Sequence, residues 1–240
     1  MRLLLTLQYL GTHYAGWQSQ TNATAIQNVI EAALSKMFAA PIRIEGAGRT
    51  DAGVHARAQR AHFDAPFAIE PRGFRRGLND LLPRDIRVTS AEPVADDFHC
   101  RFATTSKTYV YRIWNDEVAD VFAAEASAHV PQPLDASLMQ ATAQALLGHH
   151  DFAIFTVAGP EVSSTERTIT SINVVRDGAA IFITVTADGF LRSMVRRIAG
   201  SLIEIGRGKE EPGTIWTVAR WTAPAKGLTL WEVRYSQEAS

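Results

Sequence analysis

The alternation of strand-like and helix-like segments in the first half of the chain restricts the fold more than any other feature. Apolar residues recur at helical spacing in one segment, and shorter β-branched or leucine-rich runs read as strands around it. In chain order the predicted segments are strand 2–10, helix 26–38, strand 42–46, strand 56–63, helix 71–82 and strand 86–94. This β-α-β-β-α-β order predicts a lobe in which both helices cover one face of a mostly antiparallel sheet.

The second half is a looser version of the same plan. Its predicted segments are strand 107–114, helix 135–147, strands 167–175 and 179–187, helix 190–205, a short helix near 213–222 and closing strand 228–235. Alternation in the first of these strands puts Tyr109, Tyr111 and Ile113 on one face. The chain is therefore predicted to be an α+β protein of two ferredoxin-like or RRM-like lobes, residues 1–100 and 101–240, with a central cleft.

Composition excludes several classes of protein. No apolar run approaches the roughly 18 residues that span a bilayer, and Gln8 interrupts the N-terminal leucines too early for a secretory signal. We therefore expect a cytoplasmic protein without a membrane segment. The single cysteine, Cys100, excludes an internal disulfide framework and a cysteine-based zinc cluster.

Net charge alone gives no indication of a polyanionic partner. The 24 basic and 25 acidic side chains leave a formal charge of -1, and 20 of the basic residues are arginine. Arginine suits bidentate phosphate contacts, but the abundance of alanine indicates that base composition of the genome explains most of this excess.

The densest polar cluster is Gly48-Arg49-Thr50-Asp51-Ala52-Gly53-Val54-His55, between two predicted strands. Gly48 and Gly53 have the spacing of a phosphate loop, but Val54-His55 stands where that motif needs Lys-Ser/Thr, so nucleotide hydrolysis is not expected. The dinucleotide fingerprint also fails, because its glycine spacing is missed and a strand follows instead of a helix.

Three interpretations of this cluster remain from the residues alone. Arg49 could hold Asp51 ionised and make it a competent nucleophile. Asp51 could instead cap a glycine-rich turn while Arg49 lies in solvent. A metal site of Asp51, His55, His62 and perhaps His150 is the third, although the spacing matches no compact ligand pattern.

The run GRTDAGVHARAQRAHFD, read as a whole, resembles the signature of the TruA family of tRNA pseudouridine synthases. Other segments resemble further blocks of that family in the same order: YLGTHYAGWQSQ, LNDLLPRDIRV, DDFHCRFATTSKTYVYRI, HDFAIF, RTI, FLRSMVRRIAGSLIEIG and KGLTL. The resemblance extends over essentially the whole chain.

The resemblance implies an isomerase that breaks the bond between sugar and uracil nitrogen, rotates the base and rejoins the sugar to a ring carbon. It implies a tRNA substrate, uridines at about positions 38 to 40 of the anticodon stem-loop flipped out of the helix, and a homodimer. No cofactor, no metal and no nucleotide are implied.

Residue roles follow from the same resemblance. Asp51 would be the essential carboxylate, whether it adds to the sugar, adds to the base or assists elimination to a glycal. Tyr109 would stack on the target base, Arg196 would pair with the catalytic aspartate, and Arg49 would contact the RNA backbone or replace the displaced base. Tyr109 could equally be a core aromatic and Arg196 a solvated helix residue.

The distribution of charged residues along the chain is compatible with a tRNA partner. Residues 101–112 contain three basic and no acidic residues, and residues 192–209 contain five basic residues against Glu204. Acidic residues gather in 116–125 instead. A near-neutral total can therefore hide a basic groove.

The sequence departs from the family pattern at Leu10, at Ile154 and in the short segment 156–166.

Two other classes of protein also remain open. A non-catalytic RNA-binding module would not need Asp51, and a metal-dependent phosphohydrolase would use Asp51, His55 and His62.

Overall fold

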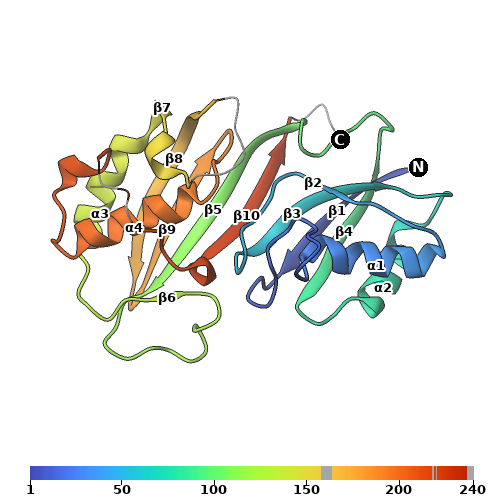
Figure 1. Ribbon diagram of the computed structural model, residues 1–240, viewed down its shortest axis with the longest axis horizontal. Coiled ribbons are helices and arrows are strands. Elements are labelled where there is room, and N and C mark those ends of the chain that lie inside the picture. Colours follow the sequence, from blue (N-terminus) through green and yellow to red (C-terminus); the bar gives the residue numbers. More distant parts are fainter. Residues whose placement is uncertain (158–163, 218, 220, 237–240) are drawn as a thin grey trace. The chain divides into compact units, whose positions relative to one another are not determined.

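The computed structural model describes the whole chain except residues 158–163, 218, 220 and 237–240 (Figure 1). Two compact units are present. Unit 1 comprises Met1–Thr105 and Leu230–Ser240, and unit 2 comprises Ser106–Thr229. The lobes predicted as 1–100 and 101–240 differ from this division, because the chain returns to unit 1 for its last strand.

Unit 1 is built on a sheet with the strand order β4-β1-β3-β10. Its strands are β1 (Arg2–Tyr9), β2 (Glu45–Gly46), β3 (His55–Asp64), β4 (Ile86–Val94) and β10 (Leu228–Tyr235). The central strand β1 runs antiparallel to both β3 and β4. The short β2 pairs with β3 outside this order.

Two helices, α1 (Ile26–Phe38) and α2 (Pro71–Leu81), pack on the same face of this sheet. Phe38 of α1 and Phe74 of α2 both contact Phe63 of β3, with ring centroids 6.0 and 5.6 Å away. The two helix rings lie 6.2 Å from each other. This aromatic cluster forms part of the apolar core of unit 1, and the predicted β-α-β-β-α-β order of an α+β lobe is confirmed.

The predicted strand 42–46 is wrong for its first three residues, since only Glu45–Gly46 pair with β3. The backbone N–H of Ile42 donates to the Ser35 hydroxyl at 3.0 Å, and that of Ile44 donates to the Glu31 carboxylate at 3.1 Å. Side chains of α1 therefore satisfy amides that a strand would have given to a neighbouring strand.

Unit 2 has the strand order β5-β9-β8-β7, with the short β6 beside β5. These strands are β5 (Thr104–Trp114), β6 (Ala128–His129), β7 (Gly148–Asp151), β8 (Glu166–Asp177) and β9 (Ala180–Ala187). All pairs along the main order are antiparallel, and β6 alone runs parallel to β5. The mostly antiparallel sheet predicted for this lobe is therefore confirmed.

The helices of unit 2, α3 (Ala136–Ala143) and α4 (Met194–Gly206), pack on each other. The predicted start of α4 at Phe190 is wrong, because Ser193 adopts the left-handed conformation with φ 59° and helical geometry begins after it. Of the helix predicted near 213–222, the described residues form a 3-10 turn at Pro212–Thr214; residues 218 and 220 lie outside the described part.

Among the described residues, no helix has both the length and the apolar character needed to cross a membrane.

Candidate active site

The loop that carries Asp51 connects β2 to β3 in unit 1, and its first two residues are hydrogen-bonded to β3. The backbone N–H of Ala47 donates to the Arg60 carbonyl at 2.7 Å, and the Gln59 side chain donates to the Gly48 carbonyl at 2.9 Å. After Asp51 the chain turns tightly: Gly53 has φ 78°, and the Val54 N–H donates to the Asp51 carbonyl at 3.1 Å. The loop thus has a defined backbone path.

A second loop, which follows β1, supports the first one from the side. The N–H of Trp17 donates to the Thr50 carbonyl at 3.0 Å, and the N–H of Gly53 donates to the Tyr14 carbonyl at 3.3 Å. These two bonds fix the backbone on both sides of Asp51.

Glycine is needed where the two loops meet. A Cβ at Gly11 would lie 2.0 Å from the Val54 carbonyl oxygen, and one at Gly16 would lie 2.5 Å from the Thr50 carbonyl oxygen. Gly16 also has φ +90°. Any side chain at either position would push the Asp51 loop away.

Buried side chains complete this support. The hydroxyls of Tyr9 and Thr50 lie 2.9 Å apart, and the N–H of Gly11 donates to Nδ1 of His55 at 2.9 Å. Both Thr50 and His55 are buried. Burial raises the pKa of Tyr9, so this phenol stays protonated over the physiological range.

The predicted site residues of unit 1 lie two positions apart in this loop. Asp51 is half-buried and Arg49 is exposed. A half-buried carboxylate on a fixed backbone can be reached by a substrate and is still held in position, which is what a nucleophile or a general base requires.

Tyr109 and Tyr111 are both buried on one face of β5 in unit 2, as the alternation predicted. Their surroundings differ. Tyr111 donates a hydrogen bond to the Pro224 carbonyl at 3.0 Å, and its ring fills the space where a Cβ of Gly227 would be. Tyr109 packs edge-on against the Phe190 ring, with centroids 5.0 Å apart and an angle of 82°.

Arg196 lies on α4 and is half-buried. Its Nε donates to the Ala223 carbonyl at 2.9 Å, while its own carbonyl accepts from the Ala223 N–H at 3.1 Å. The neighbouring Arg197 donates to the carbonyls of Ala219 and Thr156. The two arginines thus hold backbone segments against α4.

Some basic side chains of segment 192–209 form ion pairs with an acidic residue of the same segment. Arg207 and Lys209 both pair with Glu204, with N to O distances of 2.7 and 3.7 Å. Arg192, Arg196 and Arg197 are the basic side chains of this segment that do not contact Glu204 in the described structure.

The proposed metal ligands of the sequence do not form one cluster. His55 takes a backbone hydrogen bond, and Nε2 of His150 in unit 2 lies 2.7 Å from the Leu147 carbonyl. Among the described residues, the three side chains that could share a metal ion are His62, His99 and Cys100, a group without Asp51.

Sequence reasoning did not identify Tyr9, Thr50 or His55 as supports of the Asp51 loop. The available signal was the segment Tyr9–Gln20, whose two glycines and aromatic residues precede α1. Its contact partners lie some 40 residues further along the chain, which periodicity cannot reveal.

Comparison with known proteins identifies the family of this chain. A family model described as tRNA pseudouridine synthase matches residues 6–103 and 142–236. The tRNA pseudouridine synthase A of Brevibacillus brevis is 42% identical, over 98% of this chain and 99% of its own. Those of Geobacter sulfurreducens (42%, over 96% and 98%) and Syntrophotalea carbinolica (39%, over 98% and 96%) are similarly related.

The family model covers the Asp51 loop and α4, and the relatives align over 96 to 98% of the chain. The chain therefore belongs to the TruA family of tRNA pseudouridine synthases, isomerases that convert uridine in tRNA to pseudouridine.

Proposed function

We propose that Asp51 is the catalytic carboxylate of this isomerase and that its targets are uridines at about positions 38 to 40 of the tRNA anticodon stem-loop. The observation that carries the proposal is the fixed backbone around Asp51, held by Trp17 on one side and Tyr14 on the other. A reacting carboxylate must be placed to within a fraction of an ångström, and this loop meets that need.

The reaction conserves every atom of the uridine. The bond between C1′ and N1 breaks, the uracil rotates, C1′ bonds to C5, and C5 gives up a proton while N1 gains one. Asp51 can add to the sugar, add to the base or assist elimination to a glycal. In each case an ionised carboxylate stabilises or bonds to an electron-poor centre and then leaves.

Tyr109 is proposed to stack on the flipped uracil and to relay a proton. Tyr111 has a structural role: its hydroxyl donates to the Pro224 carbonyl, and its ring packs on Gly227. Tyr109 has an aromatic neighbour, Phe190, on the segment that precedes α4, which makes its ring part of an aromatic pair.

Arg49 and Arg196 are proposed to bind the substrate and set the charge around Asp51. Arg49 is exposed two residues from Asp51 and can contact the RNA backbone or occupy the space of the displaced base. That replacement compensates part of the unstacking energy of the base, about a few kcal/mol. For Arg196, the proposal is an ion pair with the catalytic carboxylate.

The TruA resemblance also supports two further proposals. The protein would act as a homodimer that shares one tRNA, and it would be cytoplasmic. Sedimentation of the purified protein at micromolar concentration tests the first, with a mass of twice 26.3 kDa expected.

A map of pseudouridine in an unmodified tRNA transcript tests the proposed target. After incubation with the enzyme, carbodiimide treatment and reverse transcription should give new stops in the anticodon arm. Asp51→Ala should give none, and Asp80→Ala, an exposed residue of α2, should behave like the wild type. Stops confined to another arm, across several tRNAs, would contradict the proposed target.

A further inference from the structure

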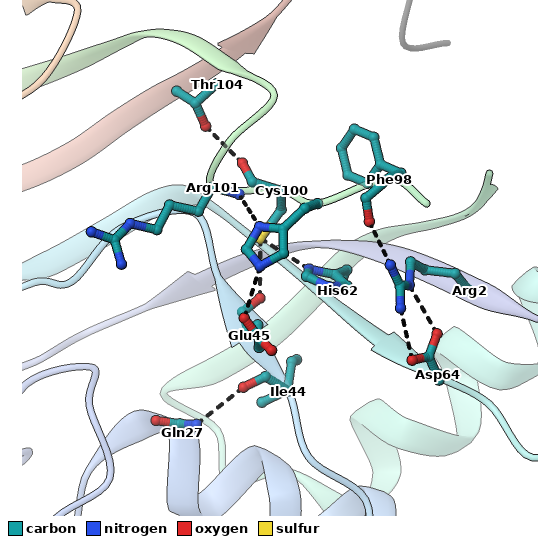
Figure 2. A network of polar contacts seen from close by, with 11 residues as sticks. Arg2, Gln27, Ile44, Glu45, His62, Asp64, Phe98, Cys100, Arg101 and Thr104 are labelled. Atoms are coloured by element: carbon teal, nitrogen blue, oxygen red, sulfur yellow. Dashed lines mark hydrogen bonds and ion pairs between the residues drawn. The ribbon is translucent and has the colours of Figure 1, made fainter. Parts of the chain in front are cut away.

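Three possible metal ligands, His62, His99 and Cys100, gather in unit 1, and the Glu45 carboxylate contacts His99. Glu45 of β2 and His62 of β3 stand opposite each other in the antiparallel register, so their side chains share one face of the sheet. His99 and Cys100 reach the same face from the segment that follows β4. Figure 2 shows Glu45, His62 and Cys100 together.

The distances between them are close to those of a metal centre. Nδ1 of His62 lies 3.2 Å from Sγ of Cys100, and Nε2 of His99 lies 3.0 Å from a carboxylate oxygen of Glu45. The ligand atoms of His62, His99 and Cys100 all lie within 4.8 Å of one another. A tetrahedral zinc ion needs ligand atoms about 3.3 to 3.8 Å apart, so contraction by roughly 1 Å would close the site.

The site is buried on one side and open on the other. Cys100 is fully buried and His62 is 5% exposed, whereas the side chain of His99 is 27% exposed and that of Glu45 is 65% exposed. His99 also lines a hollow of about 900 Å³, together with Phe98, Phe102 and Tyr235. An ion could therefore enter beside His99 and be held against an apolar interior.

We propose that Cys100, His62, His99 and Glu45 bind a zinc-type divalent cation. One thiolate, two neutral imidazoles and one carboxylate form a ligand set that zinc favours, and their two negative charges balance the charge of the ion. The nearby positive charge of Arg2 is offset by the Asp64 carboxylate, to which its guanidinium makes two 2.9 Å hydrogen bonds.

Binding would exchange hydrogen bonds for metal bonds. The thiol proton of Cys100, which points toward the Glu45 carbonyl at 3.2 Å, would leave to solvent. His99 would move its remaining proton from Nε2 to Nδ1, and the 3.2 Å hydrogen bond that Nδ1 accepts from the Arg101 N–H would be lost. This lost bond is a local cost of binding.

The bound ion would connect β2 and β3 to the segment around Cys100. Its role would be structural, because Asp51 lies in another loop and the isomerisation conserves all atoms of its substrate without a metal. Zinc should therefore raise the thermal midpoint of unfolding, and its removal should leave the pseudouridine synthase chemistry available.

Cobalt, which occupies zinc sites and absorbs light, provides the test. Metal-free full-length protein is titrated with Co²⁺ under reducing conditions. We expect one cobalt per chain, a thiolate-to-cobalt charge-transfer band in the near ultraviolet, and its displacement by Zn²⁺. The band should be absent in Cys100→Ser, and the affinity should fall at least about tenfold in His62→Gln and His99→Gln. His149→Gln, an exposed histidine of β7, is the matched control and should bind like the wild type.

Two outcomes would overturn the proposal. One is the absence of a charge-transfer band in the folded wild type, which would mean that the cluster is only hydrogen-bonded. The other is an unchanged cobalt affinity in His99→Gln, whose partly exposed side chain makes misfolding a poor explanation. Neither outcome depends on catalytic activity.

Discussion

The hydroxyl of Tyr9, the last residue of β1, lies 2.9 Å from the hydroxyl of Thr50, the residue directly before Asp51. Both side chains are buried. The central strand of unit 1 is thereby connected to the backbone of the proposed catalytic residue, so the rigidity of the sheet is transmitted to the Asp51 carboxylate.

Removing the Tyr9 hydroxyl should lower both stability and turnover. Tyr9→Phe leaves Thr50 with a buried hydroxyl, so the free energy of unfolding should fall by about 1 to 2 kcal/mol and kcat by roughly tenfold through displacement of Asp51. Urea unfolding and single-turnover kinetics measure the two effects. Because both residues form one hydrogen bond, the Tyr9→Phe/Thr50→Val double variant should cost less than the sum of the single variants. Additive costs would show that the pair is not coupled.

A methyl group at Gly11 should displace the Asp51 loop. The added Cβ would lie 2.0 Å from the Val54 carbonyl oxygen, and the clash should lower stability by about 3 kcal/mol. Gly213→Ala is the matched control, since its Cβ would meet nothing within 4 Å. Thermal midpoints and kcat should fall for Gly11→Ala alone; equal behaviour of the two variants would contradict the proposed contact between the loops.

The two tyrosines of β5 should separate into a catalytic and a structural residue. Tyr111→Phe loses the hydrogen bond to the Pro224 carbonyl, so its unfolding free energy should fall by about 1 kcal/mol. Tyr109→Phe keeps the ring against Phe190 and should retain tRNA affinity but lose kcat. If kcat fell only in Tyr111→Phe, the assignment of the two roles would be reversed.

Alkaline pH should destabilise the protein through its buried phenols. Burial and the Asp85 carboxylate raise the pKa of Tyr14 to about 12 from its ordinary 10.0. Burial also raises the pKa of Tyr9, Tyr111 and Tyr235. A raised pKa stabilises the fold below the unfolded value, and this contribution is lost as pH rises from about 10 through the folded value.

The free energy of unfolding, measured between pH 8 and pH 11, tests this pH dependence. The free energy of unfolding should fall above about pH 10. Its decrease with pH should be smaller in Tyr14→Phe. That variant loses its hydrogen bonds to Asp85 and should be less stable at neutral pH. An identical slope in both proteins would mean that Tyr14 ionises normally in the folded state.

The local order of elements was predictable because it depends on neighbouring residues. The apolar stripe from Ile26 to Phe38 and the alternation in β5 both indicate which side of an element is buried, and both are confirmed. Ile42 and Ile44 were misjudged because their amides bond to side chains of α1, a contact that no strand pattern contains.

The parts of the site that sequence could not predict all depend on long-range contacts. Asp51 was prominent because of its glycine-rich surroundings, but its supports at Tyr9 and Gly11 become visible only in three dimensions. In the same way, one cysteine excluded a cysteine-based cluster, whereas folding places Cys100 beside His62, which is 38 residues away in the chain.

The most direct test of the account compares Asp51→Asn with the wild type in single-turnover isomerisation of an anticodon stem-loop, with RNA binding measured in parallel. Asparagine keeps the size and hydrogen-bonding capacity of the side chain and removes its charge and nucleophilicity. The account predicts a rate at least about a thousandfold lower with RNA affinity within about threefold of the wild type. Isomerisation by Asp51→Asn at a rate within tenfold of the wild type would contradict a catalytic carboxylate at this position.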